Sequence, residues 1–578
     1  MTPFFPSLNS PEFKSAFAEL KEKTNQLTQT FDSFEIFPGQ IAPNPFQKFV
    51  EASNAWNQFD EYSTLISSYI YAFVTTDAKN GVAQGYLSQF MPISAEATKV
   101  WNRFTGWVGS QDPEKLSEAN GLSPDYAYFV KRCQTIAQHQ MSGPEEDLAA
   151  ELAQTGYRSW SRLHGDVTSG IEVKIPESEE VLPMAVVRNL AYDSDAKRRE
   201  TAYFAEIARW KEMETPLAAA MNAIKGEVNL LTRRRGWESP LHQAVFETNM
   251  DVATLDAMMG AAKNAFPVFR RYMQLKATKL GYDGGLHWHD VFAPIGNTGD
   301  WAYNLGADFV SKEFHGFSKK MGDLADQSFA ENWVDAEARP GKRDGAFCMG
   351  TRPGESRILM SWKESYGAVS TLAHELGHAY HNLCLQDRAP IQRETPMTLA
   401  ETASIFCEAI IGKAALRQAT PETKFGILEQ SLQRACQTVV DISSRFLFEQ
   451  KVFDARNQRS MSAEELCETM LWAQEETYGN GLSDRRHPYM WAVKPHYYGS
   501  SYYNFPYMFG HLFSLGLFAQ YEKDPSNFAA RYDDLLSSTG LADAATLAAR
   551  FGVDISTSAF WDGSLSVIAS EVELLESL

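Results

Sequence analysis

The chain has 578 residues, of which 44% are hydrophobic and 22% are charged, and its formal net charge is −20 at pH 7. A chain of this length is too long for one ordinary hydrophobic core, so we expect a large, multi-lobed protein. The acidic balance argues against a partner nucleic acid, which needs a basic face, and no apolar run reaches the ~18 residues that would span a membrane.

Helical periodicity dominates the chain and predicts a mainly α fold. Strand patterns are few and lie at 170–175, at 286–293 and, in two pieces, at 346–362. The acidic segment 176–180 reads as a junction, so we predict an N-terminal helical lobe over 1–180 and a second domain over 181–578. The predicted helices cover 11–31, 46–78, 94–109, 144–164, 193–234, 253–280, 300–322, 365–386, 397–417, 421–457, 462–478, 507–522 and 526–538.

Residues 287–290 read His-Trp-His-Asp and have the composition of a metal site. Histidines two apart on a strand share one face. However, no further ligand is evident in the neighbouring sequence, and the following Val-Phe-Ala-Pro is typical of a packed segment. We therefore predict a structural role for His287 and His289.

The segment His374-Glu-Leu-Gly-His378 is an HExxH sequence in a proline-free helical pattern, preceded by a short edge-strand pattern at 357–362. Two histidines four apart on a helix project from the same face. Their ring nitrogens can meet on one metal ion, and Glu375 then lies beside the metal as a proton acceptor. The alternative is an amphipathic helix whose histidines are only hydrogen-bonded.

A catalytic zinc needs a third protein ligand, and the residues that follow offer three glutamates. Glu394 lies in a loop just before a proline, which makes it a poor rigid ligand. Glu401 and Glu408 lie seven apart in an uninterrupted helical pattern and so share a face. Thr398 and Glu401 also form a capping box, which is an equally good account of Glu401. Glu408 is then either a carboxylate that orients a ligand histidine or a surface residue.

Residues 487–518 are rich in aromatic side chains. The glycine and serines of 498–501 predict a loop, and a helix is predicted from Tyr507 onward. Tyrosines beside a metal can donate hydrogen bonds to a developing oxyanion and can form flat apolar walls for peptide side chains. Most of the rings are expected to pack in the core, in particular Phe505, Phe509, Phe513 and Phe518.

The quoted motifs together resemble one family. Gly345-Ala-Phe-Cys348, Thr371 to His381 and Pro396 to Ser404 are similar to the oligoendopeptidase F branch of the thimet oligopeptidase family of zinc metallopeptidases. The resemblance implies a two-lobed helical oligopeptidase with a deep central channel and a small β-sheet beside the HExxH helix. It also makes 181–578 the zinc metallopeptidase catalytic domain.

The resemblance also implies the roles of the site residues. It places one zinc ion on His374, His378 and Glu401 and makes Glu375 the general base. In the aromatic segment it implies that the substrate carbonyl is contacted by a histidine and tyrosines. By position these are His496 and Tyr507 as catalytic residues and Tyr502 or Tyr503 as substrate-binding residues.

The predicted function is a zinc-dependent oligoendopeptidase that cleaves internal bonds of short peptides by a metal-activated water. One alternative is a zinc dipeptidyl carboxypeptidase, in which Arg485, Arg486 or Lys494 would bind the terminal carboxylate. The other is a catalytically inactive helical scaffold.

We expect peptide substrates and no nucleic acid or membrane partner, and the first residues show no signal-peptide pattern. The six cysteines lack CxxC spacing and predict reduced thiols and a cytoplasmic location. The oligomeric state is not encoded in any recognisable pattern.

Overall fold

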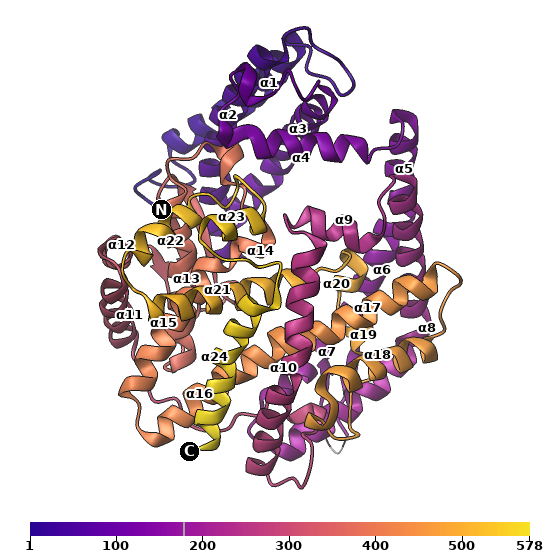
Figure 1. Cartoon of the computed structure of the whole chain (residues 1–578), viewed down its shortest axis with the longest axis vertical. Coiled ribbons are helices and arrows are strands. Elements are labelled where there is room, and N and C mark those ends of the chain that lie inside the picture. Colours follow the sequence, from indigo (N-terminus) through magenta and orange to yellow (C-terminus); the bar gives the residue numbers. More distant parts are fainter. Residues whose placement is uncertain (177, 179) are drawn as a thin grey trace. The chain divides into compact units, whose positions relative to one another are not determined.

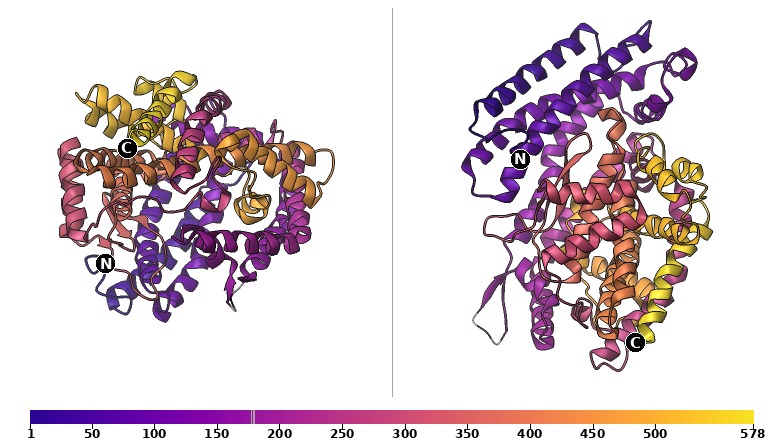
Figure 2. Two further views of the ribbon diagram at one scale, coloured as in Figure 1. Left: turned by 90° about the horizontal axis from the view of Figure 1, so that it is seen from below. Right: turned by 90° about the vertical axis from the view of Figure 1, so that its left-hand side faces the viewer.

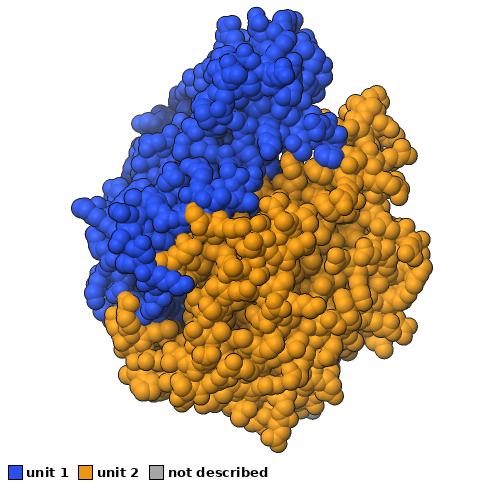
Figure 3. Space-filling view, in the orientation of Figure 1, with its two compact units in different colours: residues 1–139, 300–414, 521–551 blue, residues 140–299, 415–520, 552–578 orange. Residues whose placement is uncertain are grey.

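The computed structural model describes residues 1–176, 178 and 180–578, and these form a mainly helical protein, as predicted (Figure 1). Internal contacts group the chain into two compact units. Unit 1 comprises 1–139, 300–414 and 521–551, and unit 2 comprises 140–299, 415–520 and 552–578 (Figure 3). The predicted junction at 176–180 includes residues 177 and 179, which lie outside the described residues. The predicted division at residue 180 stays a prediction.

Unit 1 holds three groups of elements, one from each of its segments. They are α1 (Pro11–Ser33), α2 (Pro45–Thr76), α3 (Gly81–Ser110), η1 (Glu118–Asn120), α4 (Pro124–Gln138), α11 (Tyr303–Phe317), α12 (Lys319–Ala330), β3 (Val334–Asp335), β4 (Phe347–Arg352), β5 (Glu355–Leu359), α13 (Tyr366–Cys384), η4 (Pro390–Arg393), α14 (Met397–Ala400), α22 (Phe528–Leu536) and α23 (Ala544–Arg550). Two further helices, α15 (Thr402–Gln418) and α21 (Phe505–Lys523), run from one unit into the other.

Unit 2 is also built from helices, with one small hairpin. Its elements are α5 (Gly143–Thr155), α6 (Tyr157–Ser169), β1 (Glu172–Lys174), β2 (Val181–Pro183), α7 (Met184–Asn189), η2 (Leu190–Tyr192), α8 (Ala196–Arg234), α9 (Pro240–Glu247), α10 (Val252–Lys279), η3 (Trp288–Asp290), α16 (Pro421–Cys436), the π-helical turn η5 (Gln437–Asp441), α17 (Ile442–Arg456), α18 (Ala463–Tyr478), η6 (Gly479–Gly481), α19 (Met490–Val493), α20 (His496–Gly499) and α24 (Ser558–Glu576). Within the described residues, no helix combines the length and apolar character that crossing a membrane requires.

The predicted helices 144–164 and 300–322 are each divided in the structure. The predicted helix 144–164 is α5 and α6, separated at Gly156, whose backbone (φ −90°, ψ −118°) is not helical. The predicted helix 300–322 is α11 and α12, because Ser318 is extended and its Oγ accepts a hydrogen bond from the Met321 amide at 3.1 Å. A serine cap of this kind begins a new helix.

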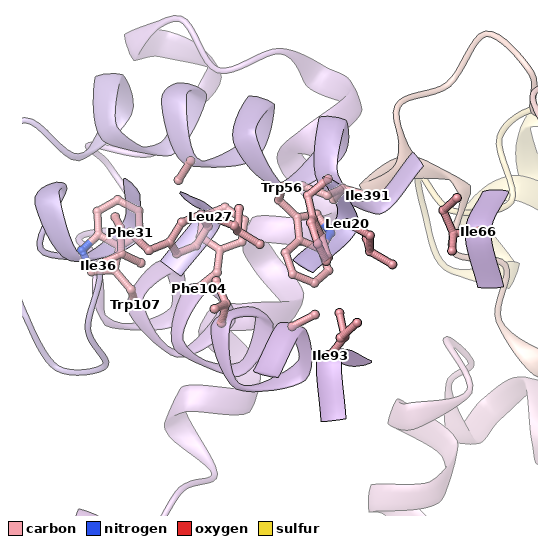
Figure 4. Packing of buried hydrophobic residues seen from close by; sticks show 14 of the residues in the cluster. Leu20, Leu27, Phe31, Ile36, Trp56, Ile66, Ile93, Phe104, Trp107 and Ile391 are labelled. Carbon is pink, nitrogen blue, oxygen red and sulfur yellow. The ribbon is translucent and has the colours of Figure 1, made fainter. Parts of the chain in front are cut away.

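The N-terminal helices of unit 1 share an aromatic core. Residues Phe13, Phe17, Leu20, Leu27 and Phe31 of α1 recur at helical spacing and are buried. They pack with buried residues of α2 and α3 (Figure 4), and these three long helices lie side by side (Figure 2, right). Each fully buried large apolar side chain contributes roughly 1.5–3 kcal/mol to stability. This core fixes the position of α2, one face of which is important below.

The sheet of unit 1 has the strand order β3-β5-β4, with β3 parallel and β4 antiparallel to β5. The strands within 346–362 are therefore confirmed, but the predicted edge strand, which is β5, is the central one. The edge strands are β3 and β4, and α13 packs against both β4 and β5. The predicted strand over 286–293 is wrong, because this segment forms the 3₁₀ turn η3 and a single bridge from Leu286 to Leu482.

Candidate metal centre

Helix α13 presents the two histidines of the HExxH sequence on one face. Its opposite face is fully buried and carries Val369, Leu372 and Leu376. The rings of His374 and His378 have centroids 4.8 Å apart and are nearly perpendicular, at 85°. Their Nε2 atoms are 3.2 Å apart. The spacing of four residues therefore brings two ring nitrogens to one point, as the sequence predicts.

Glu401 brings a carboxylate to the same point. Its Oε2 lies 3.4 Å from His374 Nε2 and 3.6 Å from His378 Nε2. The sequence suggests an uninterrupted helix around Glu401. In the structure the helix is interrupted, because Glu401 lies at the junction where α14 ends and α15 begins. The Ile405 amide donates to its backbone carbonyl at 3.1 Å, and Ser404 Oγ donates to its Oε2 at 2.7 Å. Glu401 is thus held at a helix start with its carboxylate turned toward the histidines.

The separations of the three candidate ligand atoms are compatible with a bound zinc ion. Zinc binds such ligands at ~2.0–2.1 Å with tetrahedral angles, which separates neighbouring ligand atoms by about 3.3 Å. The observed separations of the two nitrogens and the carboxylate oxygen are 3.2, 3.4 and 3.6 Å. In the described part of the chain, His374, His378 and Glu401 form the one group of acidic, histidine or cysteine side chains close enough to share a metal. Glu394, the loop alternative, is not in that group.

Glu408 lies behind His374 and fixes its ring. Its Oε1 is 2.7 Å from His374 Nδ1, and its Oε2 accepts a hydrogen bond from Ser370 Oγ at 3.0 Å. Because an ionised carboxylate can only accept, His374 carries its proton on Nδ1 and presents the lone pair of Nε2 toward Glu401. A lone pair and a carboxylate oxygen that face each other favour a cation between them. Ser370 and Ser404 are partners that our sequence analysis misses, although each lies three or four residues from an identified site residue.

Glu375 is the buried acid of the site. Its side chain is 4% exposed, and within the described residues its Oε2 has no hydrogen-bond partner. Burial is the main reason that its pKa rises to about 7, with the Glu401 charge adding to the effect and the His374 charge opposing it. A carboxylate with an uncommitted oxygen in a dry environment is a strong proton acceptor.

Gly377 allows α13 to approach α15. A β-carbon placed on Gly377 would lie 2.6 Å from Ser404 Cα and 2.7 Å from the carbonyl oxygen of Ala403. Both are backbone atoms that cannot turn aside. The glycine of the HELGH segment is therefore needed for the close packing that brings Glu401 beside the histidines.

We expect Gly377→Ala to push the two helices apart, to lower the free energy of unfolding by roughly 1–3 kcal/mol, and to weaken zinc binding. Urea unfolding and zinc titration measure these effects. Gly316→Ala is the matched control, because Gly316 lies in α11 of the same unit with nothing within 4 Å of the added carbon, and there alanine should stabilise slightly. Wild-type stability together with wild-type zinc affinity for Gly377→Ala would contradict this account.

The other predicted site residues lie in unit 2. The ring of His496 stacks on Tyr503, with centroids 4.6 Å apart and planes at 17°. The hydroxyls of Tyr503 and Tyr507 are 3.1 Å apart. His496 Nδ1 is buried without a hydrogen-bond partner among the described residues. Tyr502 differs, since it is 5% exposed, has a left-handed backbone (φ 51°) and stacks on Phe453.

Several aromatic residues and histidines are buried or hydrogen-bonded within the protein. Phe505, Phe509, Phe513 and Phe518 are buried. In the His-Trp-His-Asp segment, His287 Nδ1 is 2.8 Å from Ser483 Oγ. Asp290 accepts hydrogen bonds from Arg199 Nε at 2.7 Å and from Tyr282 at 2.6 Å. His381, one turn beyond His378, is buried with its Nε2 3.0 Å from Thr539 Oγ1.

The comparisons with known proteins point in one direction. The model of peptidase family M3 matches residues 302–567. An oligoendopeptidase F homolog from Lactococcus lactis is 24% identical over 506 residues, which cover 85% of this chain and 81% of the relative. The group B oligopeptidase PepB from Streptococcus agalactiae is 23% identical over 573 residues, which cover 96% and 94%.

Solved structures share the fold. The crystal structure of oligoendopeptidase-F from Enterococcus faecium matches with a TM-score of 0.69 at 16% identity and covers 98% of both chains. A crystal structure of a Chlamydophila abortus protein matches with a TM-score of 0.84 at 18% identity and covers 96% of both chains. At these identities the likeness concerns the fold.

Proposed function

The chain belongs to peptidase family M3, in the branch of the oligoendopeptidases F, and from this premise we propose that it is a zinc-dependent oligoendopeptidase that cleaves internal bonds of short peptides. The observation that carries the proposal is the convergence of His374 Nε2, His378 Nε2 and Glu401 Oε2 within 3.6 Å of one another. The same three residues are the ligands that the family resemblance implies.

His374, His378 and Glu401 would hold one zinc ion per chain. When bound, zinc lowers the pKa of a water molecule and polarises the scissile carbonyl. Glu408 keeps His374 in the tautomer that can bind a metal, through the contact of its Oε1 with His374 Nδ1 at 2.7 Å. Ser404 orients Glu401 through its hydrogen bond to Oε2.

Glu375 moves the proton in the proposed reaction. Its Oε2 takes a proton from the attacking water and delivers it to the nitrogen of the leaving amine. The burial of Glu375 supports this role, because a dry carboxylate gains more from accepting a proton than a solvated one. His496 and Tyr507 are proposed to donate hydrogen bonds to the substrate carbonyl oxygen, with Tyr503 supporting His496 by stacking. The burial of Tyr502 favours a packing role for that residue.

The dipeptidyl carboxypeptidase alternative needs a fixed cation for the terminal carboxylate. Two of its three candidates are engaged elsewhere, since Arg485 pairs with Glu200 at 2.6 Å and Arg486 pairs with Glu475. Lys494 is the third, and burial together with the charge of Arg445 lowers its pKa to about 8. The inactive-scaffold alternative is disfavoured by the presence of Glu375 beside a complete ligand set.

We keep the cytoplasm as the proposed location, because all six cysteines are free thiols, as expected in a reducing compartment. The oligomeric state and the deep central channel implied by the resemblance stay predictions.

An internally quenched peptide blocked at both ends tests the proposed function. We expect the purified protein to cleave it at an internal bond, identified by mass spectrometry, and we expect a chelator to abolish cleavage and added zinc to restore it. Cleavage confined to unblocked peptides, with release of C-terminal dipeptides, would support the carboxypeptidase instead. Loss of that activity in Lys494→Met would then identify the cation. No cleavage of any peptide by the zinc-loaded protein would contradict both.

A further inference from the structure

Unit 1 contains a cavity of about 380 Å³ beside His378. It opens between α2, the edge strand β4 with the turn that follows it, the C-terminal half of α13, and the segment from η4 to α14. Its lining comprises Asp60, Glu61, Thr64, 350–354, His378, His381, Asn382, Leu385, Gln386, Pro390, Arg393, Thr395 and Ala400. The proposed metal ligand His378 therefore forms part of the wall.

The cavity brings an edge strand and one face of α2 close to His378. The strand β4 pairs only with β5 in the described sheet, so its other edge can add an extended peptide by backbone hydrogen bonds. Such a peptide, next to Gly350 and Thr351, would pass the face of α2 that lines the same cavity. The residues of α2 in the lining are thus placed to contact a side chain or a terminus of the substrate.

The wall on α2 is held firmly. Trp56 and Phe59 are buried in the N-terminal core, and Ile391 of η4 packs into that core beside Trp56 (Figure 4). Asn57 Oδ1 accepts a hydrogen bond from the Ile391 amide at 3.1 Å. These contacts lie within one turn of Asp60 and fix its backbone relative to η4.

The two arginines of the cavity are already engaged. Arg352 Nε donates to Glu355 Oε2 at 2.8 Å, and its guanidinium lies 4.4 Å from the ring centroid of Phe4. Arg393 Nε donates to the Arg388 carbonyl at 2.7 Å, and its Nη2 is 3.6 Å from Glu61 Oε1. Glu61 and Glu355 thus offset both positive charges.

Asp60 is the charged residue of the cavity lining that has no oppositely charged partner among the described residues. It is half-buried, and across residues 1–176, 178 and 180–578 no group donates a hydrogen bond to its carboxylate or forms an ion pair with it. Burial is the main influence on the pKa of Asp60 and raises it, whereas the positive charge of Arg393 lowers it. A carboxylate held partly away from water without a partner gains from a cation that enters the cavity.

We propose that Asp60 receives a cationic group of the peptide substrate, either a lysine or arginine side chain or the N-terminal ammonium, in the cavity beside His378. This inference rests on the proposed function and adds a preference to it. A charge-assisted hydrogen bond in a half-buried site selects a lysine over an uncharged residue of similar length by about tenfold.

The test compares matched blocked peptides that carry lysine or norleucine at each position around the cleaved bond. A second pair compares free and acetylated N-termini, which separates the two sources of the cation. We expect wild type to prefer the cation about tenfold in kcat/KM in one of these pairs, and Asp60→Asn to bring that ratio to about one. Asp60→Lys should invert the preference toward glutamate. Glu51→Gln, the same charge change on α2 outside the cavity, should keep the wild-type ratio.

The same peptides are also measured by their dissociation constants in a Glu375→Gln background, where no turnover is needed. An equal lysine preference in wild type and Asp60→Asn, or no preference in any pair, would overturn the inference. If peptides are cleaved without any dependence on Asp60, the inference fails and the proposed function stands. If peptides bind with a preference that Asp60→Asn removes but are never cleaved, the proposed function fails and the binding site stands.

Discussion

Replacing Glu375 by glutamine is expected to lower kcat on a blocked peptide by about 10²–10⁴-fold, the usual contribution of a general base. Glutamine keeps the size of the side chain and loses its ability to accept a proton. Zinc content and thermal stability should stay near wild type, because Glu375 is not one of the three side chains that would bind the metal. The measurements are single-turnover kinetics, zinc analysis and thermal unfolding.

The matched control is Glu118→Gln, which removes one carboxylate from an exposed position of η1 in the same unit. It should retain wild-type turnover. If Glu375→Gln retains zinc and cleaves the peptide at a rate near that of wild type, then Glu375 is not the base, and another group moves the proton.

His378→Ala is expected to abolish both zinc binding and peptide cleavage, because it removes one of three protein ligands. Glu408→Gln should have a smaller effect, a loss of about 10–100-fold in zinc affinity, since Glu408 acts through His374. Zinc titration against a chelator of known affinity measures both. His315→Ala serves as control, because His315 of α11 pairs with Asp326 of α12, and the substitution should leave zinc affinity unchanged. Equal zinc affinities for His378→Ala and wild type would remove the predicted centre.

The metal centre could be predicted from the sequence where its geometry is local. His374 and His378 lie four apart on one helix, so the spacing itself brings their nitrogens together. Glu401 could be proposed by its residue type, but its capping-box alternative could be weighed only against three-dimensional structure. Its carboxylate turns toward the histidines because α14 ends and α15 begins at this residue, and a periodic pattern does not reveal such a junction.

The failures in the fold have a common cause, which is that distant residues decide local structure. The segment 286–293 has strand-like apolar alternation, but Asp290 accepts hydrogen bonds from Arg199 and Tyr282, and His287 contacts Ser483. Arg199 and Ser483 are remote from this segment in the sequence. The chain therefore turns as η3. No helix is predicted from sequence at α4, α9, α23 or α24, and the predicted helix 421–457 gives no sign of the π-helical turn η5 inside it.

Asp60 shows the same limit at the site. Nothing in its neighbourhood in the sequence distinguishes it from other acidic residues of α2. Its place in the cavity that His378 also lines depends on the packing of α2 against η4, through Asn57 and Ile391, and that packing becomes visible only when the chain is folded.

The central claim is that His374, His378 and Glu401 hold a zinc ion. It is tested most directly by anomalous X-ray diffraction from crystals of the zinc-loaded protein, recorded on both sides of the zinc absorption edge. The account predicts one anomalous peak per chain, ~2.0–2.2 Å from His374 Nε2, His378 Nε2 and a Glu401 oxygen. An anomalous peak next to other residues would contradict this claim. So would active, zinc-loaded protein whose crystals show no peak between these three side chains.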